Sequence, residues 1–280
     1  MNIENILHLA NSKLKDSLVN YSDSDSEILL SKVLKENRKY ILLNPKKKLK
    51  NDNIKFFNYL IDKRKKGEPI AYLTNIKEFW KYSFYIDNNV LIPRPDTEHL
   101  VEEVLKIYKK DSKLNILDIG TGSGCILLSI LKERKNFYGT GIDISKKALN
   151  VAKINAKVHQ LSNRIKFFYS DIDKFLLGKY DLIISNPPYI KKLCLRDLDK
   201  DIIGYEPKLA LNGGIDGFSA IKKVIVKSSI LLKRNGKLIL EIGFDQKNKC
   251  LDILKKNKFY INKIKKDYGK NDRCIVSTKV

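Results

Sequence analysis

The chain has 280 residues, of which 43% are hydrophobic and 31% are charged. This balance is typical of a soluble globular protein and excludes disordered and collagen-like chains. The longest apolar run, Cys125 to Leu131, is far shorter than the roughly 20 residues that cross a bilayer. The N-terminal residues lack the basic segment and apolar core of a secretory signal, so we expect a cytoplasmic location, of bacterial type or in an organelle.

The formal net charge is +23, which raises the question of a nucleic-acid partner. Only eight of the basic residues are Arg, whose planar side chain recognises phosphates and bases best, so we predict no dedicated nucleic-acid site. Two explanations of the excess charge stay open: a compositional bias towards Lys, and a basic surface that lies near the ribosome or RNA. The cysteines and histidines have no metal-ligand spacing, so we predict no metal site.

Apolar residues recur at helical spacing from Ile3 to about Arg64, which predicts a small helical bundle. We assign residues 1–72 to this N-terminal domain. Residues 23–26, with the sequence Asp-Ser-Asp-Ser, stand before an apolar stretch and predict the N-cap of the second helix. The Asn-Pro pair at 44–45 predicts the end of that helix or of a short continuation.

The apolar pattern changes towards alternation between Ile70 and Pro95, where aromatic and β-branched residues gather. The turn-forming residues 87–89, Asp-Asn-Asn, stand between two such runs and predict a β-hairpin that turns there. We assign residues 73–95 to this hairpin, as a linker between domains. The prolines at 93 and 95 then stiffen the chain, because each fixes its own φ and favours extended geometry before it.

Strands and helices alternate after Glu98, which predicts an α/β fold with a parallel, doubly wound sheet over residues 96–280. The predicted strands span residues 114–119, 138–144, 164–169, 180–185 and 237–242. The predicted helices span residues 124–133, 146–159 and about 216–232. Two last strands, at 259–264 and 274–278, are separated by polar turn residues and predict a closing antiparallel pair.

A glycine-rich turn, Gly120-Thr121-Gly122-Ser123-Gly124, follows the first of these strands. Its spacing differs from the G-x-G-x-x-G of dinucleotide sites and suits a nucleoside with a sulfonium and an amino-acid tail, which needs a tight, uncrowded turn. Asp143 ends the next strand, where a carboxylate can accept both hydroxyls of a ribose. Asp171 and Ile172 follow the third strand, where an acid can reach an adenine amino group and an apolar side chain can flank the ring. The series predicts S-adenosylmethionine as the cofactor.

The fourth strand ends in Asn186-Pro187-Pro188-Tyr189, the most specific signal in the chain. The prolines fix an extended turn, which holds the Asn186 side chain and the Pro187 carbonyl in a constant relation. An amide or aromatic amine is a poor nucleophile, since its lone pair is delocalised. Hydrogen bonds from both of its N–H groups to these two oxygens would favour the transition state, and Tyr189 would offer a flat face to the planar group. We predict Asn186, Pro187 and Tyr189 as catalytic residues of a methyl transfer to such a nitrogen.

Together these motifs resemble the release factor glutamine N5-methyltransferases, the family called PrmC or HemK. The resemblance covers nearly the whole chain and is carried by Glu78-Phe79-Trp80, residues 90–98, Asp118 to Gly124, Asp143, Asn186 to Tyr189, Glu206-Pro207, Leu209-Ala210-Leu211 and residues 213–217. It implies a Rossmann-like, seven-stranded class I methyltransferase domain with a small N-terminal helical domain and a connecting β-hairpin. It also implies that the N-terminal bundle takes part in recognising a protein substrate.

The resemblance further implies the roles of individual residues. The cofactor would be held by Gly120 to Gly124, Asp143, Ile172 and Asn186. The substrate would be the glutamine of a Gly-Gly-Gln loop in class 1 peptide chain release factors, held by Asn186, Pro187, Pro188 and Tyr189. The chain departs from the family pattern at Asn75, where glycine is usual, and at Lys81, where another glycine is frequent. Asn tolerates the left-handed backbone conformation, so the first change is mild.

Three alternative functions stay open at this stage. A sister enzyme that methylates a glutamine of a ribosomal protein would share the Asn-Pro-Pro-Tyr chemistry. An adenine-N6 methyltransferase on DNA or RNA would meet an amine with the same two donors, but it would need a recognition module with clustered basic and aromatic residues. A catalytically silent protein that binds RNA through its charge would have no need of the glycine turn or of residues 186–189.

Overall fold

The computed structural model describes residues 1–17 and 22–280. Its contacts divide the chain into two compact units, which are considered separately. The N-terminal unit consists of Met1–Ile76 and Asp199–Tyr205, and the sheet unit consists of Lys77–Leu198 and Glu206–Val280. The chain thus returns to the N-terminal unit for a short segment far along the sequence. The domain boundaries drawn from the sequence at residues 72 and 95 stay a prediction.

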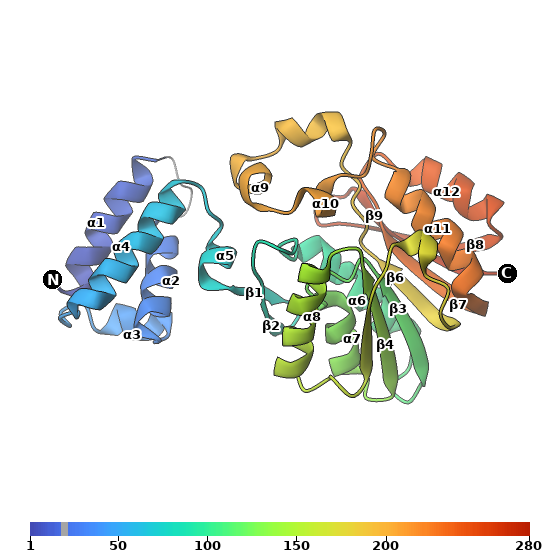
Figure 1. Ribbon diagram of the computed structural model, residues 1–280, viewed down its shortest axis with the longest axis horizontal. Coiled ribbons are helices and arrows are strands. Elements are labelled where there is room, and N and C mark those ends of the chain that lie inside the picture. The colour runs from blue at the N-terminus through green and yellow to red at the C-terminus, as the bar shows by residue number, and fades with distance from the viewer. Residues whose placement is uncertain (18–21) are drawn as a thin grey trace. The chain divides into compact units, whose positions relative to one another are not determined.

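Six helices make up the described part of the N-terminal unit (Figure 1). They are α1 (Ile3–Lys15), α2 (Ser22–Leu34), α3 (Arg38–Leu43), α4 (Asn51–Lys65), α5 (Ile70–Thr74) and α9 (Lys200–Tyr205). The apolar faces of α1 to α5 bury one hydrophobic core, in which Leu14, Leu29 and Phe57 are fully buried. Arg64 joins two parts of this unit, because its guanidinium pairs with Asp25 of α2 at 2.8 Å and with Asp201 of α9 at 3.2 Å.

The predicted cap of the second helix is wrong. Helix α2 begins at Ser22, so Asp23 and Asp25 lie inside its first turn and not ahead of it. There their carboxylates face the positive end of the helix dipole, which favours negative charge. The residue that precedes Ser22 lies outside the described residues. The Asn-Pro pair at 44–45 does follow the short continuation α3, as expected.

The β-hairpin exists, but its turn is not where the sequence placed it. Strands β1 (Ile76–Phe79) and β2 (Tyr82–Tyr85) pair in a two-stranded sheet and are joined by Trp80 and Lys81. The prediction of a hairpin turn at 87–89 is wrong: these residues follow β2, where the Asp87 carboxylate accepts a hydrogen bond from the Asn89 N–H at 2.9 Å. A two-residue loop with positive φ suits the strand twist, and Trp80 supplies it with φ +59°.

The chain has Asn75 and Lys81 where the family often has glycine, and at both places a residue with positive φ stands at that position or next to it. Asn75 has φ +60° and ends α5, the conformation that asparagine tolerates best among non-glycine residues. At the second position the left-handed residue is Trp80 itself, and Lys81 lies outside that region. Trp80 is held there by its backbone N–H, which donates to Glu98 at 2.8 Å, and by its indole N–H, which donates to Glu133 at 3.0 Å.

The sheet unit contains a seven-stranded sheet of order β5-β4-β3-β6-β7-β9-β8. The strands are β3 (Leu114–Ile119), β4 (Phe137–Asp143), β5 (Ile165–Tyr169), β6 (Tyr180–Ser185), β7 (Leu232–Glu241), β8 (Phe259–Lys266) and β9 (Asp272–Lys279). The first five are parallel, while β9 pairs antiparallel with both β7 and β8. The predicted alternation of strands and helices and the closing antiparallel pair are confirmed.

Helices cover both faces of this sheet (Figure 1). They are α6 (Glu98–Ile107), α7 (Cys125–Glu133), α8 (Lys146–Val158), α10 (Lys208–Leu211), α11 (Ser219–Leu231) and α12 (Lys247–Lys256), with short 3-10 helices η1 (Pro95–Thr97), η2 (Ile172–Lys174) and η3 (Lys192–Asp197). Successive residues of a strand point to opposite faces, so Ile116 packs with α6, α7 and α8 while Leu117 packs with α11 and α12. Burial on both faces explains why the parallel strands are almost continuously apolar. Among the described residues, the helices are too short or too polar for any to traverse a bilayer.

Candidate active site

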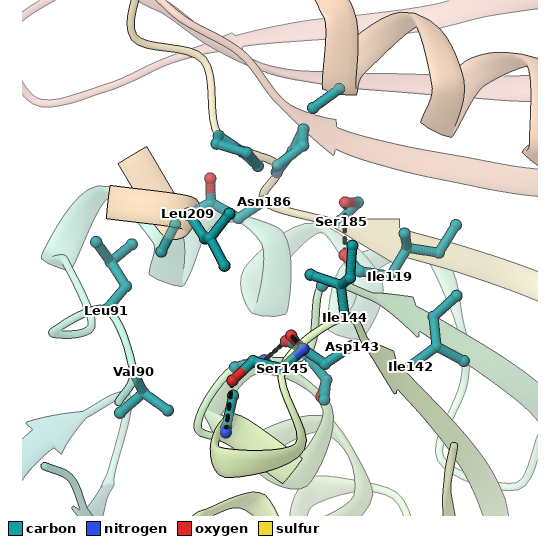
Figure 2. A pocket seen from close by; sticks show the side chains of 18 of the residues that line it. Val90, Leu91, Ile119, Ile142, Asp143, Ile144, Ser145, Ser185, Asn186 and Leu209 are labelled. Atoms are coloured by element: carbon teal, nitrogen blue, oxygen red, sulfur yellow. Dashed lines mark hydrogen bonds between the residues drawn. The ribbon is translucent and has the colours of Figure 1, made fainter. Parts of the chain in front are cut away.

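A cavity of about 320 Å³ opens at the carboxyl ends of β3, β4 and β6 (Figure 2). All the residues that line it belong to the sheet unit. The chain leaves β3 towards β4 on one side and reaches β6 on the other, so the sheet order reverses here. Such a switch point is where parallel sheets leave a crevice for ligands. The volume lies at the lower end of the range for small-molecule sites, about 300–1,000 Å³.

The glycine turn forms one wall of the cavity. It is fixed to the neighbouring strand because the backbone N–H groups of Gly120 and Thr121 both donate to the Ile142 carbonyl, at 2.9 and 3.0 Å. Gly122 has φ +54°, and a Cβ added to it would meet no atom within 4 Å, so its backbone faces open space. Gly124 has φ +80°, and a Cβ there would lie 3.0 Å from the Leu128 side chain. At Gly122, glycine is needed because φ is positive and because a side chain would occupy the space through which a ligand approaches the backbone. At Gly124, it is needed because φ is positive and because a Cβ would crowd Leu128.

Asp143 ties this turn to the end of β4. Its Oδ2 accepts a hydrogen bond from the Gly122 N–H at 2.9 Å, and its Oδ1 accepts one from the Ser145 N–H at 2.8 Å (Figure 2). Burial raises the pKa of the Asp143 carboxyl, although the backbone N–H groups of Ser145 and Gly122 lower it. Each carboxylate oxygen can accept a second hydrogen bond, so Asp143 retains acceptors for a pair of hydroxyls.

The third strand contributes Asp171 and Ile172, which both line the cavity. Asp171 stands before η2, and its Oδ1 accepts a hydrogen bond from the Asp173 N–H at 3.0 Å. The exposed side chain of Ile144 lines the cavity from the end of β4. The wall therefore offers acidic side chains beside apolar ones, as a ligand with an adenine ring and a ribose requires.

A second carboxylate lies buried beneath the glycine turn. Asp118 is fully buried, and its Oδ2 accepts a hydrogen bond from the Thr121 hydroxyl at 2.7 Å, while its Oδ1 has no hydrogen-bond partner among the described residues. Burial raises the pKa of Asp118 to about 7, although the Thr121 hydroxyl lowers it. An unpartnered buried acceptor is costly, so the Asp118 carboxyl beneath the turn is held at the expense of stability.

The Asn-Pro-Pro-Tyr segment forms the opposite wall. In Figure 2, Asn186 and Leu209 lie across the drawn space from Asp143 and Ser145. The Asn186 side-chain Nδ2 donates to the Thr97 hydroxyl oxygen at 3.1 Å. This hydrogen bond uses the donor end of the amide and leaves the Asn186 Oδ1 available as an acceptor.

Tyr189 turns away from the cavity lining. Its ring packs against the hydrophobic core on the α11 and α12 face, and the Arg273 guanidinium lies 5.8 Å from the ring centre. Its hydroxyl donates to the Glu241 carboxylate at 3.3 Å. Burial raises the pKa of the Tyr189 hydroxyl, and the Glu241 charge raises it further. Tyr189 is thus a neutral hydrogen-bond donor in this arrangement.

The structure brings together most of the residues that the sequence pointed to. The cavity is lined by Gly120, Thr121, Gly122, Ser123, Asp143, Asp171, Ile172, Asn186, Pro187 and Pro188. Gly124 and Tyr189 are outside this lining. The described residues contain no group of three His, Cys, Asp or Glu side chains placed to hold a metal ion.

The sequence interpretation quoted Thr97 and Glu206 only within motifs, without a role at the site, and it missed Glu241. Thr97 lines the cavity and holds Asn186, although the sequence interpretation gave it no role of its own within residues 90–98. Glu206 is buried, pairs with the Arg94 guanidinium and accepts a hydrogen bond from the Ile92 N–H at 3.2 Å. Glu241 carries a signal that could have been used: it is an acid at the end of the apolar run Leu238-Ile239-Leu240, where a buried carboxylate needs partners.

Comparison with known proteins adds independent findings. The family model described as the PrmC N-terminal domain matches residues 5–74, and the one described as the methyltransferase small domain matches residues 96–208. The release factor glutamine methyltransferase of Buchnera aphidicola subsp. Baizongia pistaciae is 38% identical over 279 residues, which covers 100% of both chains. That of Clostridium acetobutylicum is 37% identical and covers 100% of this chain and 99% of the relative.

Solved structures share the fold at much lower identity. A methyltransferase from Pyrococcus furiosus is 20% identical, with a TM-score of 0.52 over 79% of this chain and 97% of that one. The ribosomal protein L11 methylase from Lactobacillus delbrueckii subsp. bulgaricus is 18% identical, with a TM-score of 0.52 over 73% and 89% of the two chains. The expected class I methyltransferase fold is thereby confirmed. The full-length likeness to the bacterial relatives decides the family: this chain belongs to the release factor glutamine methyltransferases.

Proposed function

We propose that this chain methylates the side-chain nitrogen of the glutamine in the Gly-Gly-Gln motif of class 1 peptide chain release factors, with S-adenosylmethionine as the methyl donor. The single observation that carries the chemistry is the Asn186 amide at the cavity wall, whose donor end is bound to Thr97 and whose oxygen is left to accept. Membership of the family supports the choice of substrate.

The residues that line the cavity fit the cofactor. We propose that the Gly120 to Gly124 turn admits its amino-acid part, that Asp143 accepts its ribose hydroxyls, and that Asp171 and Ile172 meet its adenine. When bound, S-adenosylmethionine supplies a methyl group on a positively charged sulfur, and its transfer to the amide nitrogen releases one N–H proton. The open space at Gly122 and the free acceptor capacity of Asp143 support this assignment.

We propose that the protein contributes to the transfer mainly through Asn186 and Pro187. The two N–H groups of the substrate amide would donate to the Asn186 Oδ1 and to the Pro187 carbonyl. Both hydrogen bonds strengthen as positive charge develops on the nitrogen, so they stabilise the transition state more than the bound substrate. Pro188 keeps the two acceptors in a fixed relation, because its ring restricts the backbone and biases the residue before it.

We also propose a division of labour between the two units. The cavity belongs wholly to the sheet unit, so the N-terminal unit is free to recognise the folded release factor. A substrate that works in translation places the reaction in the cytoplasm or an equivalent organellar compartment. The basic surface would then lie near the ribosome during recognition, without a dedicated nucleic-acid site.

One labelling experiment separates this function from its rivals. The protein is incubated with S-adenosylmethionine carrying a labelled methyl group and, in separate reactions, with a release factor, the same factor with its motif glutamine changed to alanine, a ribosomal protein mixture, and bulk RNA. Label should enter only the unmodified release factor. Label in RNA, in ribosomal protein, or equally in the alanine variant would refute the proposal and point to the corresponding alternative.

A further inference from the structure

The chain forms part of the cavity wall with residues 206–213, which include the short helix α10. Three residues of this segment, Pro207, Leu209 and Ala210, line the cavity. The proposed function gives the segment no task. Its contacts hold it at both ends, so the residues between the ends have a fixed place at the site.

Glu206 holds the first end of the segment. Its Oε2 accepts a hydrogen bond from the Ile92 N–H at 3.2 Å, and its Oε1 pairs with the Arg94 guanidinium. The Glu206 side chain is buried, and a buried carboxylate is stable only when it is paired and hydrogen-bonded. Glu206 thus ties the 206–213 segment to a stretch of chain 114 residues earlier, in which Arg94 also lines the cavity.

Gly213 holds the other end. Its N–H donates to the Ile190 carbonyl at 2.9 Å, and the Ile190 N–H donates to the Leu211 carbonyl at 3.2 Å. A Cβ added to Gly213 would lie 2.8 Å from the Pro188 carbonyl oxygen and 2.8 Å from the Tyr189 Cα. The backbone at Gly213 therefore packs directly on the Asn-Pro-Pro-Tyr segment, where only glycine fits.

Leu209 is the side chain that this arrangement presents to the cavity. It is 71% exposed although it lines the cavity, and Figure 2 shows it with Asn186 on the side of the drawn space opposite Asp143. A single exposed leucine on a protein surface needs no explanation, but this one belongs to a wall that is held at both ends. A glutamine side chain carries its amide on two methylene groups, which an apolar surface on the Asn186 side would shield from water.

We propose that Leu209 binds the aliphatic part of the substrate glutamine, and that Glu206 is a positioning residue that keeps Leu209 in place through Ile92 and Arg94. The inference rests on the proposed function and deepens it, because it names the contact that recognises the stem of the substrate side chain. The methylene groups take no part in the reaction, so the contact is equally strong in the bound substrate and in the transition state. Its loss should raise KM and leave kcat nearly unchanged.

The first test truncates Leu209 in the full-length enzyme, with full-length release factor as substrate. We expect KM for the release factor to rise about tenfold or more in Leu209→Ala, as when a methylene-sized contact is lost from an apolar site. Leu209→Met keeps an apolar side chain of similar volume, so its KM should lie within about threefold of wild type. In both variants kcat should stay within about threefold, and the Kd for S-adenosylmethionine within about twofold, of the wild-type values.

The second test asks whether Glu206 acts through Leu209. Glu206→Ala removes both acceptors and should raise KM at least about fivefold, while Glu206→Gln keeps one oxygen acceptor and should recover part of the loss. The double variant Glu206→Ala, Leu209→Ala should have a KM within about threefold of the worse single variant, because both changes remove the same contact. Losses that multiply in the double variant would overturn the positioning role.

Two variants serve as matched controls. Leu176 is 70% exposed and Glu103 is buried and paired with Lys263 at 2.9 Å, but neither lines the cavity. Leu176→Ala and Glu103→Ala should have the kcat and KM of wild type, measured per folded molecule. Unchanged KM in Leu209→Ala, a Leu209→Met enzyme as impaired as Leu209→Ala, or a loss explained wholly by weaker S-adenosylmethionine binding would each overturn the proposal.

A further measurement does not depend on catalysis. We expect hydrogen exchange of the Ile92 backbone N–H to be at least about tenfold faster in Glu206→Ala than in wild type, Leu209→Ala and Glu103→Ala, because this N–H has lost its acceptor. Equal exchange in all four proteins would overturn the role of Glu206. If wild type did not methylate release factors, the proposed function would fail while the exchange still decided whether Glu206 holds the segment.

Discussion

Asn186 provides the most direct test of chemistry at the scale of one residue. Replacement by alanine removes one of the two oxygens proposed to accept from the substrate amide, and it leaves the Pro187 carbonyl and the cofactor wall in place. We expect kcat to fall by about 10²–10³-fold, as when one transition-state hydrogen bond is removed from other enzymes. The Kd for S-adenosylmethionine, measured by calorimetry, should change much less.

Asn150→Ala serves as the control for this substitution. Asn150 is exposed on α8 and does not line the cavity, so both its kcat and its cofactor affinity should match wild type. An Asn186→Ala enzyme that turned over at the wild-type rate would show that the amide has no part in the transfer.

The ionisation of Glu241 should make the free energy of unfolding depend on pH. Its pKa is raised from an ordinary value of 4.5 to about 7 because burial disfavours the charged form, so the folded protein binds a proton more tightly than the unfolded chain between these values. By linkage, the free energy of unfolding falls as the pH rises from about 4.5 to about 7, by up to about 3 kcal/mol for this one group.

Glu241→Gln should remove this loss and unfold at higher urea concentration than wild type at pH 8, while the difference shrinks or reverses at pH 5. Equal urea midpoints for the two proteins at both pH values would contradict the shift. Asp118, with its pKa raised to about 7, should contribute in the same direction, so Glu241→Gln should still lose stability as the pH rises, but less than wild type.

The sequence predicted the residues whose chemistry is local and missed those that act through tertiary contacts. Asn186 and the glycine turn are recognisable because proline and glycine restrict or free the backbone wherever they stand. Thr97 has no such signature, since its importance comes from Asn186, 89 residues away in the sequence. Glu241 is one acid in a long apolar strand, and it lies beside Tyr189, which follows β6, and beside Cys274 of β9.

Among the elements, the glycine turn can be tested by one substitution and its effect on cofactor affinity. Gly122→Ala forces a Cβ into the left-handed region and into the space that the cofactor would fill. We expect the Kd for S-adenosylmethionine to rise at least about tenfold, since a strained left-handed residue alone costs of order 1–3 kcal/mol. Equilibrium binding to the purified variant measures this change.

Gly204→Ala is the comparison for that variant. A Cβ at Gly204 would also meet no atom within 4 Å, but this glycine lies in α9 and is not in the left-handed region. Its cofactor affinity should equal that of wild type. Equal affinity in Gly122→Ala would show that the turn does not approach the ligand.

Strands β3 and β6 were predicted to the residue, whereas β7 begins at Leu232, ahead of the predicted start at residue 237, and the hairpin turn was misplaced. Strands β3 and β6 begin and end at the predicted residues because most of their side chains are apolar and are buried against helices on both faces of the sheet. The hairpin turns instead at Trp80, a residue with no local preference for positive φ. Glu98 and Glu133 hold it there, and these contacts exist only after the sheet unit has folded.

For the whole molecule, the decisive question is what the N-terminal unit contributes. The cavity lies entirely within the sheet unit, so a chain that lacks residues 1–72 should still bind S-adenosylmethionine with nearly wild-type affinity. If the N-terminal unit recognises the release factor, kcat/KM for that substrate should fall at least about 100-fold in the truncated chain. Calorimetry and the methyl-transfer assay measure the two effects separately, and circular dichroism checks the fold.

Full-rate methylation by the truncated chain would assign recognition to the sheet unit alone. Loss of cofactor binding would instead show that the cavity depends on the N-terminal residues for its shape. The grouping of the segment Asp199–Tyr205 with the N-terminal unit was beyond sequence reasoning. Nothing in the composition of that segment marks it off from its neighbours; the carboxylate of Asp201 joins it to Arg64.

The order of strands in the sheet has a consequence for folding during synthesis. β9 is the last strand along the chain, yet it lies between β7 and β8, where Cys274 pairs with Glu241 and Arg273 covers Tyr189. A growing polypeptide still attached to the ribosome has an open edge at β7 until this final strand emerges. An enzyme that prepares the factors ending translation would thus become competent only after its own β9 has been made and has paired with β7.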